Sequence, residues 1–314
     1  MATPVISSEE WIAKIQNTPR KAEDFVTAFY EYSIGAICTD AKLLRIPLDD
    51  HLVHRGDGCF ESLTIAERRI LELDAHMARL ERSATRLGIK APLSYAELKQ
   101  IVIDTAKVGN APHGSIKLLM GRGEGGLGIS PKECPVASFY CVATKGNPPA
   151  PSYWEKGITA CKSEIPAKQP FLAQIKSTNY LPNVFMAQEA EAKGVSVSIS
   201  FDEDGYLAEA AIANVGIIDK NGVFVLPYFK RALAGTTALL AKSIAETYMP
   251  VETRNIEEHE IFEAREFLLF GTGSQCVAIT HYEGKKIADG VPMENAKKLQ
   301  KLIYQKLIET GTPF

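Results

Sequence analysis

The stretch Ile175-Lys176-Ser177-Thr178-Asn179-Tyr180-Leu181-Pro182-Asn183, followed by a helix-like run over residues 184–193, is the point around which the chain is organised. It places Lys176 after an apolar segment, where a loop passes into a helix. A lysine at such a junction can lose part of its hydration, which lowers its pKa and leaves a neutral amine. That amine can form a Schiff base with a carbonyl compound. Because most single lysines are solvated surface residues, this interpretation depends on the rest of the sequence.

Composition excludes several classes of protein. The 314 residues suffice for two domains, and the content of 46% hydrophobic and 23% charged residues is typical of a soluble globular protein. A net charge of −3, without a block of Lys or Arg, argues against nucleic-acid binding. The six cysteines form no CxxC pair and have no His cluster nearby, which favours buried free thiols over disulfides or a metal site.

Features that would direct the chain out of the cytoplasm are not visible. The start Met1-Ala2-Thr3-Pro4-Val5 has no basic region followed by an apolar core, and no apolar run approaches the length of a membrane span. We therefore expect a cytoplasmic protein with no membrane partner.

The first half of the chain predicts a leader and a small domain. Residues 7–32 have the pattern of one or two amphipathic helices, so a helical leader is expected over residues 1–33. A small N-terminal domain is expected over residues 34–145, and its short, hairpin-linked strands predict an antiparallel sheet. The expected strands cover residues 35–38, 43–48, 59–65, 69–73, 115–121 and 136–144, and the expected helices cover residues 75–87 and 95–108.

The second half predicts a larger domain behind a linker. Gly146-Asn147-Pro148-Pro149-Ala150-Pro151 can continue neither a helix nor a strand, so residues 146–152 are expected to link the domains and residues 153–314 to form the larger one. The expected strands cover residues 157–163, 195–201, 212–218, 223–226, 267–270 and 276–281, and the expected helices cover residues 184–193, 232–248, 256–264 and 295–310.

Two turns downstream of Lys176 have the composition of an anion site. Gly235-Thr236-Thr237 opens a helix, where free N–H groups and the positive end of the helix dipole favour phosphate. Gly271-Thr272-Gly273-Ser274 could supply a second set of N–H groups. Each turn alone is more often an ordinary cap or reversal. With a Schiff-base lysine upstream, the two together indicate a phosphorylated aldehyde, and pyridoxal phosphate is such a cofactor.

Pyridoxal phosphate also needs an acid at its ring nitrogen. Glu209 lies in a mostly apolar stretch at the entry to a strand and is the candidate for this acid. The alternative is a glutamate in a turn that points to water.

The order of these motifs resembles the fold-type IV (class IV) pyridoxal-phosphate aminotransferases, from about residue 34 to the C-terminus. The motifs are His54-Arg55-Gly56-Asp57-Gly58-Cys59-Phe60-Glu61, His76-Met77-Ala78-Arg79-Leu80, the Lys176 stretch, Glu209 with Asn214, Gly235-Thr236-Thr237 and Gly271-Thr272-Gly273. The resemblance implies an α+β fold with a small N-terminal α/β sandwich domain and a larger C-terminal pseudo-barrel domain. It also implies a homodimer with its active site at the domain boundary.

The resemblance assigns roles to individual residues. Lys176 looks like the lysine that bonds to the cofactor and later moves a proton, and Glu209 like the partner of the ring nitrogen. Arg79 matches the phosphate-binding arginine, Thr237 and Thr272 match hydroxyl donors to the phosphate, and N–H groups near Thr236 help. Tyr180 falls close to the family's active-site tyrosine. The expected substrate neighbours are Arg55, Phe60, Arg122, Gly273 and Ser274.

The substrate carboxylate has no obvious partner in the sequence. Bacterial D-amino-acid aminotransferases trap it with an arginine and a histidine, and this chain has Leu127 and Ile129 at the matching positions. Arg55, Arg122 or backbone amides are the remaining candidates, although either arginine could instead form a structural ion pair.

The motif strings around His54 and Lys176 look most like the plant-type D-amino-acid aminotransferase branch. We therefore expect ping-pong transfer of an amino group between a D-amino acid and a 2-oxo acid. The alternatives are an L-branched-chain aminotransferase, an (R)-amine transaminase and an aminodeoxychorismate lyase. A non-catalytic protein that binds pyridoxal phosphate is the alternative outside the enzymes.

Overall fold

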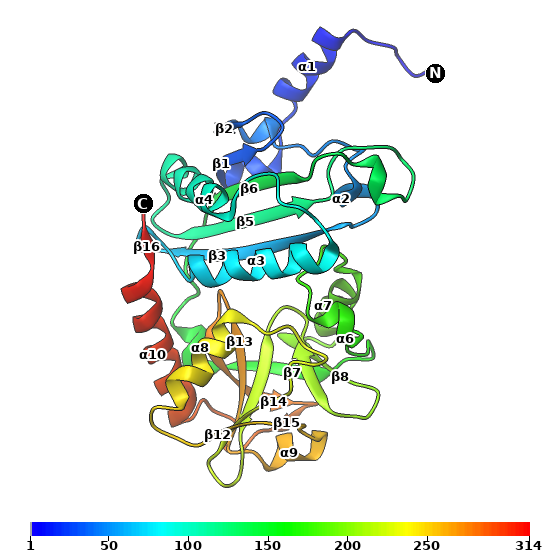
Figure 1. Ribbon diagram of the computed structural model, residues 1–314. Helices are drawn as coiled ribbons and strands as arrows, with labels where there is room; N and C mark the ends of the chain where they lie inside the picture. Colours follow the sequence, from blue (N-terminus) through cyan, green and yellow to red (C-terminus); the bar gives the residue numbers. More distant parts are fainter. Residues whose placement is uncertain (1) are drawn as a thin grey trace.

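The computed structural model describes residues 2–314 and contains two β-sheets, one above the other in Figure 1. The first sheet has seven strands, each antiparallel to its neighbours. In sheet order these are β16 (Thr312–Pro313), β4 (Arg69–Ile70), β3 (Gly58–Ala66), β5 (Gly114–Gly121), β6 (Ser138–Lys145), β1 (Val26–Glu31) and β2 (Ala36–Cys38).

The two faces of the first sheet have different environments, because successive side chains of a strand point to opposite sides. Leu63 of β3 and Ile116 of β5 are buried against the helices α3 (Leu73–Leu87) and α4 (Tyr95–Gly109). The intervening residues, such as Phe60, face a hollow that the second sheet also lines. One face therefore forms a core with the helices and the other helps to build a cavity.

The second sheet closes on itself. Its strands run in the order β12 (Val251–Thr253), β11 (Phe224–Leu226), β10 (Asn214–Ile218), β13 (Glu266–Gly271), β14 (Gln275–Tyr282), β7 (Ile158–Lys162), β8 (Val197–Phe201) and β9 (Leu207–Ala210), with β15 (Lys285–Lys286) beside β14. Because β9 also pairs with β10, the strands from β10 to β9 form a closed ring. This ring and the helix-covered first sheet confirm the predicted α+β fold with its pseudo-barrel.

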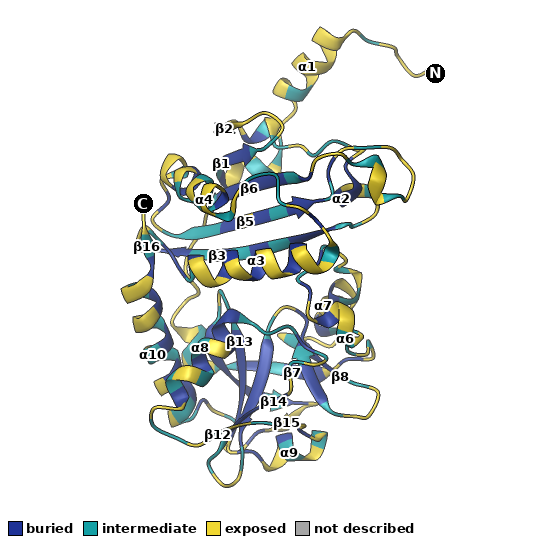
Figure 2. Cartoon of the chain, in the orientation of Figure 1, coloured by how far each residue is buried: buried dark blue, intermediate teal, exposed yellow. Residues whose placement is uncertain are grey.

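Helices cover the outside of the barrel. Ile217, Phe267 and Ile279 belong to one apolar core with residues of β7 to β9, whereas Leu268 belongs to another core with α8 and α10. Figure 2 shows these barrel strands as buried and the outer faces of the helices as exposed. The helices of this half are α5 (Ser152–Lys156), α6 (Pro170–Ala173), α7 (Leu181–Ala192), α8 (Thr236–Ala245), α9 (Glu258–Glu263) and α10 (Glu294–Thr310).

The prediction of a helical leader over residues 1–33 is wrong in its second part. Helix α1 (Ser8–Asn17) projects from the body and no residue of it is buried. Residues 26–31 instead form β1, which pairs with both β6 and β2. Valine, threonine, phenylalanine and tyrosine in this segment favour a strand, and pairing with β6 overrides the helix-like spacing.

Three further predictions need correction. Residues 43–48 form no strand, because a 3₁₀ turn (Ala41–Leu43) ends there and an irregular segment follows. Strand β9 is absent from the predicted strands, because its four residues are too short to show a period. Residues 153–314 are expected to lie wholly in the larger domain, but the end of this segment returns to the first sheet through β16. The remaining short helical pieces are Lys21–Asp24, α2 (His51–His54) and Pro131–Glu133.

All six cysteines are free thiols, and four of them are buried. Within residues 2–314, no helix is both long and apolar enough to cross a bilayer.

A buried charge network joins α3 to β3. Glu61 accepts hydrogen bonds from Arg79 Nε at 2.8 Å and from Arg79 Nη2 at 2.7 Å, and its Oε2 lies 2.7 Å from His76 Nδ1. Burial alone would raise the pKa of Glu61, but the bonds from Arg79 and His76 outweigh it and lower the pKa to about 2. The carboxylate therefore stays ionised and fixes the Arg79 guanidinium.

Glu61→Gln should destabilise the apoenzyme by about 3–5 kcal/mol, because it leaves the buried Arg79 charge without its counter-charge. Urea unfolding followed by circular dichroism measures the change. The exposed Glu191 on α7 provides the matched control, since Glu191→Gln should alter the unfolding free energy by less than about 0.5 kcal/mol. Equal effects of the two substitutions would contradict the importance of this network.

Candidate active site

The Lys176 segment is bound to the start of β3 by backbone hydrogen bonds. The carbonyl of Lys176 accepts from the Phe60 N–H at 2.9 Å, and the Thr178 N–H donates to Gly58 at 2.9 Å. The Thr178 hydroxyl also donates to the Gly56 carbonyl at 2.8 Å. These bonds join a loop that leads into α7 to a strand of the other sheet. The side chain of Lys176 is thereby directed into a cavity between the sheets.

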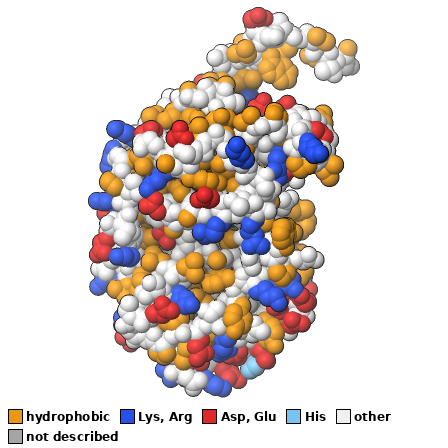
Figure 3. Space-filling view, viewed as in Figure 1, with side chains coloured by type: hydrophobic (Ala, Val, Ile, Leu, Met, Phe, Trp, Pro, Cys, Tyr) orange, Lys and Arg blue, Asp and Glu red, His pale blue; other side chains and the backbone are white. Residues whose placement is uncertain are grey.

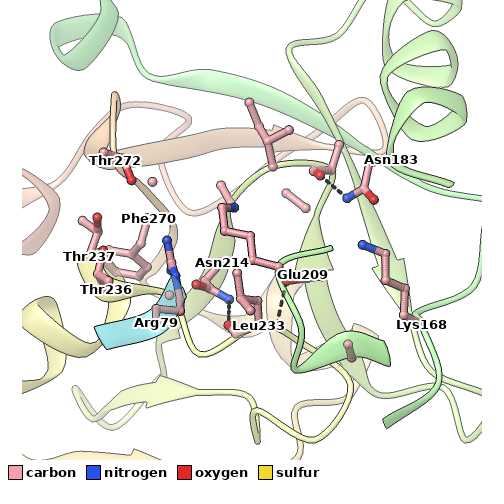
Figure 4. Close-up of a pocket in the computed structure, with 18 of the residues that line it drawn as sticks. Arg79, Lys168, Asn183, Glu209, Asn214, Leu233, Thr236, Thr237, Phe270 and Thr272 are labelled. Atoms are coloured by element: carbon pink, nitrogen blue, oxygen red, sulfur yellow. Dashed lines mark hydrogen bonds between the residues drawn. The ribbon is translucent and has the colours of Figure 1, made fainter. Parts of the chain in front are cut away.

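This cavity brings together most of the residues that the sequence singled out. Figure 4 shows Arg79, Glu209, Thr236, Thr237 and Thr272 around one space. They come from α3, β9, the start of α8 and the β13–β14 turn, and Lys176 and Tyr180 also line it. Residues separated by more than a hundred positions therefore meet at one site.

Lys176 has the environment of a reactive amine. Burial and the Arg79 guanidinium lower its pKa to about 8, against the opposite effect of the Glu61 and Glu209 carboxylates. Its Nζ lies 4.6 Å from the centre of the Phe60 ring. A substantial fraction of the side chain is therefore neutral in mildly alkaline solution and available for a Schiff base.

Glu209 and Asn214 hold the segment before α8 from two sides. The two residues are partners across β9 and β10. Glu209 Oε2 accepts the N–H of Leu233 at 3.0 Å, and the Asn214 side chain donates to the Leu233 carbonyl at 2.8 Å. Burial raises the pKa of Glu209 to about 7, although the Leu233 N–H and the Lys168 and Lys176 ammonium groups oppose this change.

The start of α8 forms one wall of the cavity. A Cβ at its N-cap, Gly235, would lie 2.0 Å from Asn214 Oδ1, so any other residue would force Asn214 or the start of α8 to move. The hydroxyl of Thr236 donates to Glu72 Oε2 at 3.0 Å, whereas Thr237 is 3.5 Å from the same oxygen. The Thr236 hydroxyl is thus used between α3 and α8, and this residue offers an anion its backbone N–H.

Arg79 presents a free edge to the same wall. Its Nε and Nη2 bind Glu61, while Nη1 has no hydrogen-bond acceptor among residues 2–314. The side chain is only 6% exposed, so its charge is poorly screened by water. A guanidinium, the N–H groups of a helix N-terminus and the nearby hydroxyls of Thr237 and Thr272 together suit a phosphate group.

A larger hollow of about 710 Å³ opens beyond Lys176. Tyr180 lines both spaces, and its ring centre lies 5.0 Å from that of Phe60, which lines the hollow, with the two ring planes at 85°. Burial raises the pKa of Tyr180 to about 12, so its hydroxyl remains a hydrogen-bond donor. Gly273 and Ser274 also line this hollow, as does Thr272.

The two arginines considered for the substrate carboxylate lie elsewhere. Arg122 makes a two-pronged bond with Asp57, at 2.9 and 3.0 Å, and donates to the carbonyls of Leu87 and Gly88. Arg55 donates to carbonyls of the glycine-rich loop, over residues 127–128. Neither arginine lines the cavity or the hollow of its own chain. Of the two roles considered for Arg122, the structure therefore shows the structural ion pair, with Asp57.

Sequence reasoning missed several residues of the site. Lys168 and the buried Asn183 line the cavity, whereas Lys117, Tyr153 and Trp154 line the hollow. Lys117 left a signal, because it is a charged residue within the otherwise apolar run Ile116 to Met120. The others left none, since only the fold brings them near Lys176.

The fold and site define a class of protein. A cavity that holds a desolvated lysine, a buried carboxylate opposite it and a cationic anion cradle fits pyridoxal phosphate at both of its ends. Lys176 would bond to the aldehyde carbon, Glu209 would face the ring nitrogen, and the start of α8 with Arg79 would hold the phosphate.

Residues 58–282 match the family described as "Amino-transferase class IV", and the chain belongs to this family. It is therefore an aminotransferase-family enzyme whose cofactor is pyridoxal 5'-phosphate.

Known proteins resemble the chain over most of its length. The D-amino-acid transaminase of Arabidopsis thaliana chloroplasts is 32% identical over 99% of this chain and 83% of its own. A Methanocaldococcus jannaschii protein, provisionally named a branched-chain-amino-acid aminotransferase, is 29% identical over 83% of this chain and 91% of its own. The branched-chain amino acid aminotransferase of Escherichia coli has a TM-score of 0.82 at 21% identity and covers 90% of this chain and 94% of its own.

Covalent capture of pyridoxal by Lys176 in the apoenzyme should increase with pH around a midpoint of about 8. Glu209→Gln should move that midpoint to lower pH, because the Glu209 carboxylate raises the pKa of Lys176. Borohydride reduction followed by mass spectrometry of the Lys176 peptide measures the capture. Peptides with exposed lysines in the same samples are the control. A midpoint that Glu209→Gln leaves in place would exclude this electrostatic coupling.

Gly235→Ala should weaken cofactor binding about tenfold or more, because the new Cβ would displace Asn214 or the start of α8. Equilibrium titration of the apoenzyme with pyridoxal phosphate gives the dissociation constant. Gly146→Ala is the matched control, since a Cβ added at Gly146 would lie 3.8 Å from its nearest neighbouring atom. Unchanged affinity of the Gly235 variant would show that the wall tolerates a shift.

Proposed function

We propose that the protein is a transaminase that moves an amino group between a D-amino acid and a 2-oxo acid by a ping-pong mechanism. The observation that carries the proposal is the placement of Lys176 and Glu209 in one cavity beside an anion cradle. The preference for a D-amino acid is supported by the similarity over nearly the whole chain to the Arabidopsis D-amino-acid transaminase. The roles that the family resemblance implies are part of this proposal, and they fall to Lys176, Glu209, Arg79, Tyr180, Thr236, Thr237 and Thr272.

Each residue performs a limited physical task. Bound pyridoxal phosphate withdraws electrons from the substrate's α-carbon, so that the proton there becomes acidic. Lys176 Nζ, with its pKa of about 8, takes that proton and later returns it. Glu209, fixed by the Leu233 N–H, places a carboxyl group opposite the lysine, and because its pKa is about 7 this group is mostly ionised in mildly alkaline solution. Arg79 and the start of α8 prevent the phosphate end from moving.

The part of the substrate beyond its reacting carbon lies in the larger hollow. Phe60, Tyr153 and Trp154 supply aromatic surface there, and Ile212 and Leu269 supply aliphatic surface. Such walls suit an apolar side chain, and they support the second candidate, an L-branched-chain aminotransferase. The similarity to the Methanocaldococcus jannaschii protein supports the same candidate.

The same proposal includes a homodimer. Leu127 and Ile129 of the glycine-rich loop are 68% and 82% exposed, and a second subunit would cover such apolar side chains. Figure 3 shows further hydrophobic side chains on the projecting helix α1, where Trp11 is 63% exposed. A cytoplasmic location stays a prediction.

Half-reactions of the holoenzyme test the proposed activity. Mixing with D-alanine should convert the absorbance of the bound cofactor, whereas L-leucine and (R)-1-phenylethylamine should leave it unchanged. Lys176→Ala should reduce the conversion rate by on the order of 100-fold or more, because it removes the base. Conversion with L-leucine alone would move the enzyme to the branched-chain group. A spectrum that none of the three donors changes would favour a non-catalytic binding protein.

A further inference from the structure

A polar patch occupies the face of the first sheet that lines the larger hollow. In β3 and β5 this face carries Phe60, Ser62 and Thr64 and, on the neighbouring strand, Ser115 and Lys117. Ser62 and Lys117 are directly opposed in the antiparallel register, and the Lys117 ammonium donates to the Ser62 hydroxyl. Glu61 lies on the opposite, buried side of the sheet, where it is bonded to Arg79 and His76. Its carboxylate therefore points away from the hollow.

Lys117 has no acidic partner. Among residues 2–314 no carboxylate lies within ion-pair distance of its Nζ, which contacts the Ser62 hydroxyl and lies 5.3 Å from the centre of the Phe60 ring. The walls of the hollow lower the pKa of Lys117 by desolvation, whereas the Glu61 charge raises it. A solvent-accessible ammonium that faces a hollow without a counter-charge is suited to an anionic ligand.

The patch lies next to the reactive amine. The ammonium groups of Lys117 and Lys176 approach the same ring, Phe60, at 5.3 and 4.6 Å from its centre. Other than Lys176, Lys117 is the only lysine or arginine among the described residues that line the hollow, and His113 is the only histidine. Among the side chains of the hollow, the Lys117 ammonium is therefore the cationic group placed beside a substrate held at Lys176.

We propose that Lys117 and Ser62 form the carboxylate-binding subsite of the hollow, the position that the arginines of the N-terminal half do not fill. This inference rests on the proposed transaminase function and adds a specificity-determining residue to it. The Lys117 ammonium binds a carboxylate oxygen of the amino acid or 2-oxo acid, and the Ser62 hydroxyl, which accepts a hydrogen bond from Lys117, donates its own proton to the other oxygen. The carboxylate is either the one beside the amino group or a second one on the side chain.

Binding of unreactive acids to the holoenzyme tests the subsite without catalysis. Propionate carries one carboxylate, glutarate carries two, and propionamide is the uncharged control. Each is titrated while the absorbance of the bound cofactor and the heat of binding are recorded. Lys117→Met should raise the dissociation constant about 10- to 100-fold for the acids that use the subsite and leave propionamide unchanged. Lys117→Arg should recover most of the affinity.

The pattern of losses identifies the carboxylate. A loss for propionate and glutarate alike assigns the subsite to the carboxylate beside the amino group, and a loss for glutarate alone assigns it to a second carboxylate and a dicarboxylic substrate. Lys145→Met removes an exposed charge from the same sheet and is the matched control, with wild-type affinities expected. If Lys117→Met binds both acids as tightly as wild type does, the proposal is overturned.

Failure of this inference is distinguishable from failure of the proposed function. A wild-type enzyme that transfers an amino group while Lys117→Met keeps its affinity for carboxylates removes the subsite only. A wild-type enzyme whose cofactor spectrum no amino donor changes removes the proposed function, and with it the role of the subsite in transamination. A second readout supports the geometry: because Lys117 lowers the pKa of Lys176, Lys117→Met should move pyridoxal capture to higher pH.

Discussion

The backbone bond from the Phe60 N–H to the Lys176 carbonyl, at 2.9 Å, connects the two halves of this protein at its reactive residue. Because Phe60 belongs to the first sheet and the Lys176 segment leads into α7 beside the second, the bond fixes the lysine where the sheets face each other. The position also explains its chemistry. Apolar and cationic surroundings from both halves favour the neutral amine, and neither half alone would desolvate it.

Charge in the site is arranged in matched groups. Glu61 neutralises and orients Arg79, whose Nη1 has no hydrogen-bond acceptor among residues 2–314, and the Leu233 N–H orients Glu209 opposite the lysine. Lys117 is different, because its neighbour is a hydroxyl and its carboxylate partner is absent from residues 2–314. The Lys117 ammonium, which faces the hollow without a counter-charge, is the basis of the proposed carboxylate subsite.

Local chemistry predicts much of this arrangement and fails at identifiable places. Gly235, Thr236 and Thr237 correctly indicate the start of a helix, and the strands predicted over residues 59–65 and 115–121 correspond to β3 and β5. The strand over residues 26–31 escapes prediction, because pairing with β6 is a contact with a segment more than a hundred residues away. Helix-like spacing within the segment carries no information about that partner.

The sequence by itself determined the class of the enzyme and its cofactor chemistry, because a lysine, an acid, an arginine and glycine-threonine turns in this order each carry a local physical requirement. Only the tertiary structure decided which side chains share the site. It places Arg55 and Arg122 outside the hollow, sets Glu209 and Asn214 on either side of Leu233, and brings Lys117 and Lys176 to the same Phe60 ring. The reason is that side-chain proximity depends on sheet register and barrel closure, which are non-local properties of the chain.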